Sequence, residues 1–425
     1  MSILCLIPTL ILKAIRFSIY LLYRLLKLIF LLLRNIICCF PRSRKDASKS
    51  LDLELGKSTG PRRFSYKSLA AATLKFSDKQ KLGEGGFGCV YRGCLKSGRN
   101  KHEPQEVAVK RISSGSKQGV KEYVSEVKII SRLRHRNLVR LIGWCHQRGE
   151  LLLVYEFLPN GSLDSHLFEK KEKGKKKKKE KKKKKDKEKE RCALPWETRY
   201  RVALGLASAL VYLHEEGEQC VVHRDVKSSN VMLDSDFNAK LGDFGLARLV
   251  DRELGLKSTA VAGTFGYLAP ECFITGKASK ESDVFSFGVV ALEIAAGRKA
   301  VEASREEEEE ETHVRLVDWV WRLHGEGRIL DAADERLKNK KDGKFDGRQM
   351  ERLLKVGLWC VHPDKGQRPS MRQVIRALSF EGGVPEMPEK MPEPVFSQGP
   401  FPGFSTSDSL PSSTFGSSIA STSIV

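Results

Sequence analysis

The stretch that decides the fold is HRDVKSSN, residues 223–230. The apolar pair VV (221–222) precedes it, and the apolar run VML (231–233) follows it. A loop of charged and polar side chains held between two buried runs is unfavourable unless those side chains have partners. We therefore expect residues 223–230 to form a site with defined contacts and not an ordinary surface turn.

The side chains of this loop suit phosphoryl transfer. That reaction needs a carboxylate that orients an attacking hydroxyl and accepts its proton, and an amide oxygen that binds a metal ion. We predict that Asp225 is the base and that Asn230, five residues on, binds Mg²⁺ or Mn²⁺. Lys227 is expected to neutralise γ-phosphate charge, and it favours Ser or Thr over Tyr as the acceptor. His223 is expected to brace the loop.

A second polar motif, Asp243-Phe244-Gly245, follows the run AKLG. Asp243 is predicted to chelate the metal ion together with Asn230. We call residues 223–230 the catalytic loop. Phe244 is expected to pack between the start of this loop and a helix-like run that contains Glu126. This motif therefore adds the second half of a predicted metal site.

The motif APE (269–271) begins 26 residues after Asp243. The interval contains the hydroxyl residues Ser258, Thr259 and Thr264, which is typical of an activation loop. Arg224, beside the predicted base, is expected to pair with a phosphate group added in this interval.

The glycine-rich stretch GEGGFG (83–88) lies upstream of these motifs. In a dinucleotide-binding fold such a stretch follows a strand and opens a helix. Here Val90 and a second β-type run follow, which predicts a hairpin whose backbone folds over phosphates. By itself the motif is also compatible with an ordinary glycine-rich hairpin.

Lys110 ends the apolar, strand-like run VAVK (107–110). A lysine on a strand usually points into water, but after a glycine-rich hairpin it can reach the α- and β-phosphates. A carboxylate on a nearby helix must then hold it. Glu126 is the predicted partner, because it lies among apolar residues of a helix-like run. Glu122, one turn earlier, is the alternative and is expected to be solvated.

All these motifs occur in the order that a protein kinase requires. Short β-type runs come first in the chain, and long helix-like runs follow. We therefore predict an α+β, bilobal protein-kinase fold with a small β-rich N-lobe and a larger helical C-lobe. Such a fold implies ATP and Mg²⁺ or Mn²⁺ as cofactors.

Composition divides the chain into four parts. Residues 1–40 are predicted to be a hydrophobic and basic membrane-associating segment, and residues 41–75 a juxtamembrane linker. Residues 76–380 are the predicted kinase domain, which a lysine-rich insert interrupts at 169–191. Residues 381–425 are rich in Pro, Ser and Gly and are predicted to be a disordered tail.

The N-terminal segment is mostly Leu, Ile, Phe and Tyr, with five basic residues among them. On a helix these basic residues fall within an arc of about 80°. A spanning helix needs about 18 apolar residues with few charges, so the basic stripe favours a helix at the membrane interface. Palmitoylation of Cys38 and Cys39 is the expected second anchor. A spanning helix and a buried core helix are the alternatives, and a cleaved signal peptide is not expected.

The formal charge of +22 is concentrated in two segments. Residues 1–49 hold nine Lys or Arg and one acid, and residues 169–191 hold sixteen basic and six acidic residues. The rest of the chain is nearly balanced, so this charge does not indicate a polyanion partner for the catalytic body. The insert has no aromatic residue to stack on bases, and we expect a solvated loop without nucleic-acid binding. Lipid contact is the alternative for the insert.

The chain resembles the plant receptor-like kinases, and within them the cytoplasmic kinase part of L-type (legume) lectin-domain receptor kinases. The matching text covers roughly residues 62–380 and includes FSYKSLAAAT, LGEGGFGCVYRG, VVHRDVKSSNVMLD, AKLGDFGLARL and GTFGYLAPE. Receptors of this family carry a lectin ectodomain, a signal peptide and a clean spanning helix. We recognise none of these in the sequence, so sugar binding is not carried over to this chain.

The resemblance implies roles for further residues. Tyr155 is similar to the gatekeeper, and Glu156 and Leu158 are similar to residues whose backbones bind adenine. Asp283 looks like the residue that braces the catalytic loop. The residues expected to bind nucleotide are Leu82, Gly83, Gly85, Gly88, Val90, Lys110, Glu156 and Leu158.

Two further implications concern regulation and architecture. Arg368 looks like the ion-pair partner of Glu271. Ser258, Thr259 and Thr264 match positions at which the activation loops of the family are phosphorylated.

The function that these observations imply is membrane-associated signalling by a Ser/Thr protein kinase. We expect it at a membrane, the plasma membrane in particular, with the kinase domain on the cytosolic side. The expected partners are protein substrates, membrane lipids and a receptor or co-receptor kinase. The alternative is a pseudokinase scaffold that binds partners without catalysis. Loss of Lys110, Asp225, Asn230 or Asp243 would favour that alternative, and all four are present.

Overall fold

The computed structural model describes residues 60–85, 88–95, 104–112, 117–168, 194–217, 219–250, 263–303, 313–338 and 346–393. The chain divides into two units, Met1–Gly60 and Pro61–Val425, and every described helix and strand belongs to the second unit. The expected membrane segment and the lysine-rich insert lie outside the described residues. Within the described part, no helix is both long enough and apolar enough to cross a membrane.

Most strand residues come from the first part of this unit, because the later strands have only three residues each. In chain order they are β1 (Arg62–Arg63), β2 (Lys81–Gly85), β3 (Gly88–Leu95), β4 (Gln105–Ile112), β5 (Leu141–Gln147), β6 (Glu150–Glu156), β7 (Cys220–Val222), β8 (Val231–Leu233), β9 (Ala239–Leu241), β10 (Arg248–Val250), β11 (Val301–Ala303) and β12 (His313–Arg315). The first six form one sheet in the order β1-β5-β6-β4-β3-β2, and the others pair as β7–β10, β8–β9 and β11–β12.

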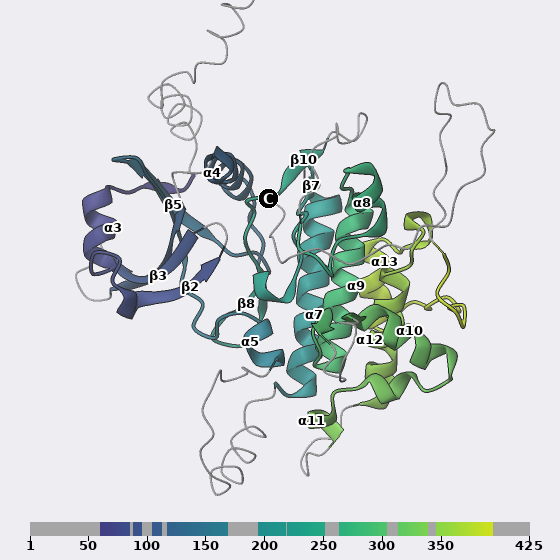
Figure 1. Ribbon diagram of the computed structural model, residues 1–425. Helices are drawn as coiled ribbons and strands as arrows, with labels where there is room; N and C mark the ends of the chain where they lie inside the picture. Colours follow the sequence, from purple (N-terminus) through teal and green to yellow (C-terminus); the bar gives the residue numbers. More distant parts are fainter. Residues whose placement is uncertain are drawn as a thin grey trace, which may run out of the picture. The chain divides into compact units, whose positions relative to one another are not determined.

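The helices come mainly from the second part. In chain order they are α3 (Tyr66–Ala72), α4 (Lys117–Ile130), α5 (Asp164–Leu167), α7 (Trp196–Val211), α8 (Pro270–Thr275), α9 (Lys280–Ala296), α10 (Leu316–Gly325), α11 (Glu335–Lys338), α12 (Gly347–Cys360) and α13 (Met371–Leu378). Short helical turns are η1 (Asp78–Gln80), the π-helical η2 (Tyr212–Glu216), η3 (Ser228–Asn230), η4 (Ile329–Ala332) and η5 (Lys365–Gln367). Figure 1 shows the sheet with α3 and α4 on one side of the unit, and the bundle around α7, α9 and α12 on the other. The predicted α+β arrangement, with a β-rich N-terminal lobe and a larger helical lobe, is confirmed.

Alternation along strand β4 explains why the sheet carries a helix on each face. Successive side chains of a strand point to opposite faces. Val107 and Val109 are fully buried on the face that α3 covers. Lys110 points to the other face, where it contacts a residue of α4. One strand therefore supplies both the hydrophobic core of the lobe and a polar group for the site.

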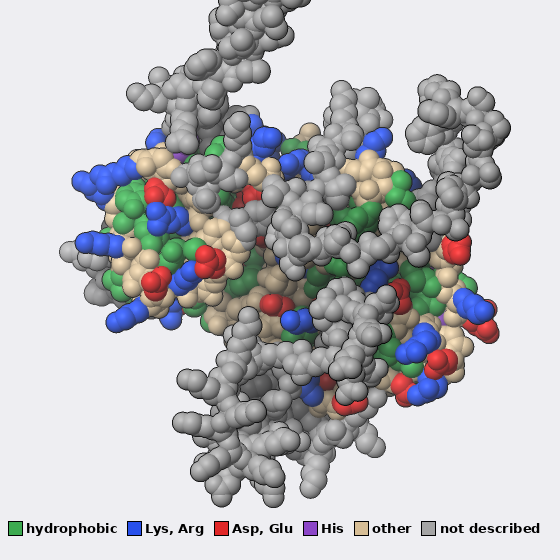
Figure 2. Space-filling view, in the orientation of Figure 1, with side chains coloured by type: hydrophobic (Ala, Val, Ile, Leu, Met, Phe, Trp, Pro, Cys, Tyr) green, Lys and Arg blue, Asp and Glu red, His purple; other side chains and the backbone are tan. Residues whose placement is uncertain are grey.

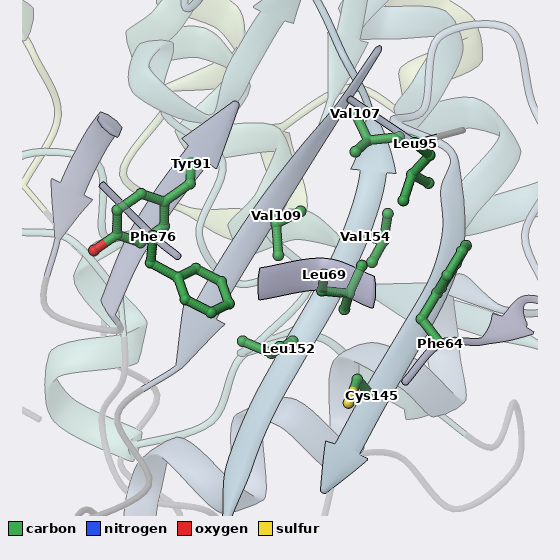
Figure 3. Close-up of a cluster of buried hydrophobic side chains, with 10 residues drawn as sticks. All are labelled: Phe64, Leu69, Phe76, Tyr91, Leu95, Val107, Val109, Cys145, Leu152 and Val154. Carbon is green, nitrogen blue, oxygen red and sulfur yellow. The ribbon is translucent and has the colours of Figure 1, made fainter. Parts of the chain in front are cut away.

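The structure incorporates part of the expected linker into the β-rich lobe. Ser65 caps α3 by accepting a hydrogen bond from the N–H of Ser68, and β1 pairs in parallel with β5. Figure 3 shows Phe64, Leu69 and Phe76 gathered with valines and leucines of the sheet. From Arg62 onward, the segment 41–75 therefore belongs to the folded lobe, because α3 buries its apolar side chains against the sheet.

Helix α9 forms the centre of the helical lobe. It begins after Ser279, whose N–H donates a hydrogen bond to Ser282 Oγ at 3.0 Å, and it ends at Gly297, whose φ of 61° suits glycine. Every residue from Ser282 to Ala296 is buried. Since a helix that is apolar on all sides must be covered on all sides, α7, α10 and α12 pack around it.

The first residues of the predicted tail are also part of this lobe. The indole Nε1 of Trp321 donates a hydrogen bond to the carbonyl of Pro388 at 3.1 Å. His324 Nε2 lies 3.2 Å from the carbonyl of Met387. Both residues are on α10, so Met387 and Pro388 lie against this helix, in contrast to the disorder expected over 381–425. The part beyond 393 lies outside the described residues.

Candidate active site

A cavity of about 450 Å³ lies between the sheet and the helical lobe. It is lined by all eight residues predicted to bind nucleotide, and by Glu126, Asn230 and Asp243. These residues come from the β2–β3 hairpin, β4, α4, the segment after β6, the catalytic loop and the segment after β9. The fold therefore brings together motifs that are far apart in the sequence.

The glycine-rich stretch forms the turn of the β2–β3 hairpin, with Gly85 paired to Gly88. A Cβ placed on Gly83 or Gly85 would meet nothing within 4 Å, so the hairpin borders open space there. Gly88 is different, because its φ is 129° and a Cβ would lie 2.0 Å from the carbonyl oxygen of Arg111. Only glycine fits at that position. The open hairpin leaves room for phosphate groups beneath its backbone.

Lys110 connects three elements of the site. Its Nζ lies 3.0 Å from Glu126 Oε2 and 2.7 Å from Asp243 Oδ1. Burial by itself lowers the pKa of Lys110, but the charges of Asp243 and Glu126 outweigh it and raise the pKa above the ordinary lysine value. The side chain is therefore a fixed cation inside the cavity, and Glu126 is its partner on α4 as predicted from the sequence.

The environment of Glu126 differs from a simple ion pair. Burial raises the pKa of its carboxyl, while the charge of Lys110 opposes that rise. The phenol of Tyr155 also donates a hydrogen bond to Glu126 Oε1. Burial and this carboxylate together raise the pKa of Tyr155 well above its ordinary value. Tyr155, which resembles a gatekeeper, thus holds the carboxylate of Glu126 in place beside Lys110.

The expectation that Glu122 is solvated was wrong. Glu122 is buried, and its Oε1 accepts a hydrogen bond from Gln118 at 2.9 Å. Its Cβ lies 3.3 Å from the position that a Cβ on Gly245 would occupy. The segment after β9 packs against this turn of α4, and that tertiary contact removes Glu122 from water. Burial raises the pKa of the carboxyl as a result.

Three residues contact the predicted base, two from its own loop and one from the segment before α8. Lys227 Nζ lies 2.8 Å from Asp225 Oδ2. Thr264 donates a hydrogen bond to Asp225 Oδ1 at 2.7 Å and accepts one from Lys227 at 2.8 Å. Asn230 Nδ2 donates to the carbonyl of Asp225 at 2.9 Å and to its Oδ2 at 3.1 Å. Asp225 is therefore a buried carboxylate surrounded by hydrogen-bond donors.

Asp283 on α9 holds the start of the loop. Its carboxylate accepts hydrogen bonds from the backbone N–H groups of His223 at 2.7 Å and Arg224 at 2.8 Å. Arg224 has a φ of 71°, in a region that residues other than glycine adopt only when their surroundings impose it. His223 lies 3.1 Å from the carbonyl of Gly242 and contacts the ring of Phe244. The bracing expected of His223 and Asp283 thus has a structural basis.

The pair expected between Arg368 and Glu271 is present. Two nitrogens of the guanidinium lie 2.7 and 2.8 Å from the two carboxylate oxygens. This bidentate ion pair ties the residue that follows η5 to α8, at the end of the activation segment. Ser258 and Thr259 lie outside the described residues, whereas Thr264 contacts the predicted base.

The cavity also fits a nucleotide with a divalent metal ion. Both hydrogen bonds of the Asn230 side chain use Nδ2, which leaves its amide oxygen for a metal. Asp243 provides carboxylate oxygens at the same cavity, and such oxygens are the ligands that Mg²⁺ prefers. Burial tends to raise the pKa of Asp243, but Lys110 overcomes this and lowers it, so the carboxylate stays ionised.

Several cavity residues were not identified from the sequence. They include Ala108, Val139 and Met232, which line the apolar walls. The alternation of side chains between the two faces of a strand could have identified Ala108 and Met232. Ala108 lies two residues from Lys110 on β4 and so shares its face, while Met232 is less buried than Val231 and Leu233 on either side. Val139 precedes β5 in an irregular segment, where no periodicity exists to find it.

The comparisons with known proteins agree with this geometry. Residues 76–378 match the family described as protein tyrosine and serine/threonine kinase. L-type lectin-domain containing receptor kinase IX.1 of Arabidopsis thaliana is 55% identical over 343 residues, which are 81% of this chain and 48% of that protein. Kinase IX.2 of the same plant is 46% identical over 394 residues, which are 91% of this chain and 54% of that protein.

A relative from rice shows the same pattern. L-type lectin-domain containing receptor kinase SIT2 of Oryza sativa subsp. japonica is 49% identical over 333 residues, which are 78% of this chain and 44% of that protein. The chain spans about half the length of these curated relatives. The resemblance to the kinase part of L-type lectin-domain receptor kinases is thus confirmed, and the chain belongs to the protein tyrosine and serine/threonine kinase family.

Proposed function

We propose that this chain is a serine/threonine protein kinase that transfers the γ-phosphate of ATP to protein hydroxyls. The observation that carries this proposal is the contact between Thr264 and Asp225. An aliphatic hydroxyl of the chain itself donates to the carboxylate at 2.7 Å. A substrate Ser or Thr would make the same kind of contact with its own short side chain, and Lys227 is near enough to stabilise charge there.

The residues have distinct roles in this proposal. Asp225 orients the acceptor hydroxyl and takes its proton, and Lys227 offsets negative charge beside it. Lys110, held by Glu126, binds phosphate oxygens. Asn230 and Asp243 would hold Mg²⁺, or Mn²⁺, which when bound offsets the charge of the phosphates.

The remaining residues of the cavity bind the nucleotide without reacting. The glycines at 83, 85 and 88 leave space for the phosphates, and Leu82 and Val90 cover the base. Glu156 and Leu158 supply backbone groups to adenine. The carboxylate of Glu156 is 3.1 Å from Lys240 and accepts the N–H of Arg140, so its side chain is already engaged.

Radiolabel transfer from ATP to a generic basic protein tests the reaction. The wild type should label serine or threonine, and Asp225→Asn should lower the rate by about 10²–10⁴-fold. Asp236→Asn, on an exposed turn, is the matched control and should retain the wild-type rate. Label found only on tyrosine would contradict the acceptor specificity. If the wild type transfers no more label than Asp225→Asn with either Mg²⁺ or Mn²⁺, a pseudokinase scaffold is favoured.

We also propose that the chain works at a membrane, with residues 1–40 as the anchor. The segment 41–75, which is part of the folded lobe from Arg62 onward, leads into the kinase domain at 76–380. The support is the basic stripe on an apolar sequence and the names of the relatives, which are receptor kinases. A receptor or co-receptor kinase is the partner that those names suggest. The plasma membrane, with the kinase domain on its cytosolic face, is the proposed location.

Fractionation of the full-length chain and of a chain lacking residues 1–40 tests this anchor. The full-length chain should sediment with membranes, and the shortened chain should not. Release by carbonate would support an interfacial helix, and retention would support a spanning one. Equal distribution of the two chains between fractions would contradict the anchor.

A further inference from the structure

A second cavity, of about 510 Å³, shares no lining residue with the nucleotide cavity. It is bordered by the connection between α4 and β5, by helix α7 and by the β8–β9 hairpin. We call it the α7 cavity. Its volume is within the range of about 300–1,000 Å³ that is typical of ligand sites. The proposed reaction makes no use of it.

Asn137 gives this cavity a hydrogen-bond acceptor that is not used. The residue is 7% exposed, and its Nδ2 donates a hydrogen bond to the carbonyl of Ala239 at 2.8 Å. Its Oδ1 is buried and has no hydrogen-bond partner in the described part of the chain. The amide cannot be flipped, because its oxygen would then face the carbonyl oxygen of Ala239, which is also an acceptor. A buried polar atom without a partner is uncommon, and this one indicates a ligand with a hydrogen-bond donor.

Packing holds Asn137 in this orientation. A Cβ on Gly205 of α7 would lie 2.8 Å from Asn137 Nδ2 and 3.3 Å from the Cβ of Ala239, so the three residues are in close contact. The backbone of Asn137 is also fixed, because its carbonyl accepts the N–H of Leu241 at 2.8 Å. The acceptor therefore belongs to a surface that is formed before a ligand binds, which lowers the cost of binding.

Three cationic side chains line the same cavity: Arg136, Arg201 and Lys240. Both arginines are exposed, and neither forms an ion pair within the residues that the structure describes. Arg201 donates one hydrogen bond, from Nη2 to the carbonyl of Asp236 at 2.9 Å. Lys240 is 3.1 Å from Glu156. The two guanidinium groups therefore retain donors for an anionic ligand.

Asp234 also lines the cavity, but its carboxylate is already engaged. Its Oδ1 accepts the N–H groups of Asp236 and Asn238 at 2.9 Å, and its Oδ2 accepts Nδ2 of Asn238 at 3.1 Å. Burial raises the pKa of Asp234, but these hydrogen bonds and the charge of Lys240 outweigh it and lower the pKa. Three cations against this one carboxylate leave the wall of the cavity with excess positive charge.

We propose that the α7 cavity binds an extended acidic segment of a partner protein. A backbone N–H of that segment donates to Asn137 Oδ1, and an Asp or Glu side chain pairs with Arg136 and Arg201. The support is chemical complementarity, since a peptide combines a neutral donor and a negative charge within one residue. A fully ionised phosphate has no donor for Asn137, and a flat lipid surface would meet the arginines without reaching the buried oxygen. The proposal is independent of phosphate transfer.

Fluorescence anisotropy of a labelled acetyl-Ala-Glu-Ala-Glu-Ala amide with the full-length chain tests the site. Arg136→Glu combined with Arg201→Glu should weaken binding by about 10-fold or more, because like charges that face each other oppose binding. Arg132→Glu combined with Arg134→Glu is the matched control. It makes the same change of charge on exposed residues that do not line the cavity, and it should bind like the wild type.

Methylation of the peptide backbone tests the acceptor of Asn137 without altering the protein. Each backbone nitrogen is methylated in turn, which removes one N–H and keeps the acidic side chains. Methylation of the nitrogen that faces Asn137 should weaken binding by about 10-fold, because Oδ1 again lacks a donor. Equal affinity of all the methylated peptides and the parent peptide would refute the contact with Asn137.

Other locations of the peptide give different results. Binding that is unchanged by Arg136→Glu with Arg201→Glu would place the peptide on another basic segment, such as 169–191, and would overturn the proposal. Phosphatidylserine vesicles and a single-stranded RNA serve as competing probes. If the arginine changes abolish binding of either probe while the peptide does not bind at all, the cavity recognises that probe and the proposal is wrong. A chain that binds the peptide at this cavity but transfers no phosphate would refute the kinase proposal alone.

Discussion

Lys110 illustrates how single residues set the electrostatics of the site. Its ammonium group is nearly buried and lies between two carboxylates from different elements, Glu126 on α4 and Asp243 after β9. Removing one member of such a buried group leaves the others uncompensated. Asp243 also has a φ of 61°, a conformation that needs support from its surroundings. Because of these contacts, a change at Lys110 also alters the electrostatic surroundings of Glu126 and Asp243.

Replacing Lys110 by methionine should lower kcat by about 10²–10³-fold, the range found when one electrostatic stabiliser is removed from an active site. Methionine keeps the length of the side chain but cannot bind phosphate or offset Glu126 and Asp243. Lys355→Met, which breaks a surface pair with Glu351 on α12, is the control and should leave kcat unchanged. Steady-state kinetics on a peptide measures both, and equal rates for the two variants would exclude the assigned role.

At the scale of elements, α3 and the crossing of α9 with α12 show how close contacts hold each lobe together. Leu69 is the fully buried residue of α3, whereas Leu74, shortly after the helix, is 64% exposed. In the helical lobe, Gly288 of α9 and Gly357 of α12 face each other without side chains. The two contacts have opposite requirements. The core beneath α3 needs the large side chain of Leu69, whereas the crossing of α9 with α12 has no room for a side chain at Gly288.

Leu69→Ala should lower the free energy of unfolding by about 2–5 kcal/mol, as for other leucines removed from a core. Leu74→Ala removes the same atoms from an exposed position and should change it by no more than about 0.5 kcal/mol. Urea unfolding followed by tryptophan fluorescence, which includes Trp144 of the sheet, provides the measurement. Equal effects would mean that α3 is not part of the folding unit.

Gly288→Ala should also destabilise the protein, by about 1–3 kcal/mol. A Cβ there would lie 2.6 Å from the Cβ of Cys360 and 2.8 Å from the carbonyl oxygen of Gly357, and backbone cannot move aside easily. Gly347→Ala, at the start of α12, meets nothing within 4 Å and should be neutral or stabilising by up to about 1 kcal/mol. In thermal unfolding, only Gly288→Ala should lower the Tm if the two helices cross as described.

At the scale of the whole folded unit, the nucleotide cavity is the place where the two lobes meet. Hairpin β2–β3 and β4 border it from the β-rich lobe, and the catalytic loop borders it from the helical lobe. Acidic and basic side chains are both present over the visible surface of the two lobes (Figure 2), in keeping with the concentration of net charge in 1–49 and 169–191. Recognition at the cavity therefore depends on local groups and not on the net charge of the chain.

ATP with Mg²⁺ at about 100 times its Kd should stabilise the protein by about 2.7 kcal/mol, because a ligand that binds only the folded state adds its binding free energy. Chelation of the metal with EDTA should remove most of this gain. Asp243→Asn should lose the same part of the gain in the presence of Mg²⁺. Asp331→Asn, on the exposed surface, should keep the full gain. Thermal shift measures all four conditions, and a gain insensitive to EDTA would contradict the metal assignment.

Much of the fold and of the site could be predicted from the sequence. The catalytic loop and Asp243 were recognisable because their polar residues are close in sequence and flanked by apolar runs. The partners that come from far along the chain were harder. Glu122 was expected in water, because its helix alone leaves it one turn from Glu126 and gives no sign of the segment that covers it. The burial of residues 64–76 against the sheet was likewise not apparent, since their pattern is short.

The sequence by itself therefore determined the identity and order of the chemical groups: Asp225, Lys227 and Asn230 in one loop, Asp243 after it, and Lys110 before it. Only the tertiary structure decided which distant groups meet. Lys110 and Asp243 are 133 residues apart, and Thr264 is 39 residues from Asp225. Asn137 is an ordinary loop residue in the sequence, and only packing gives it its buried position. The physical reason is that local patterns record neighbours along the chain, whereas burial and charge pairing depend on elements that the sequence separates.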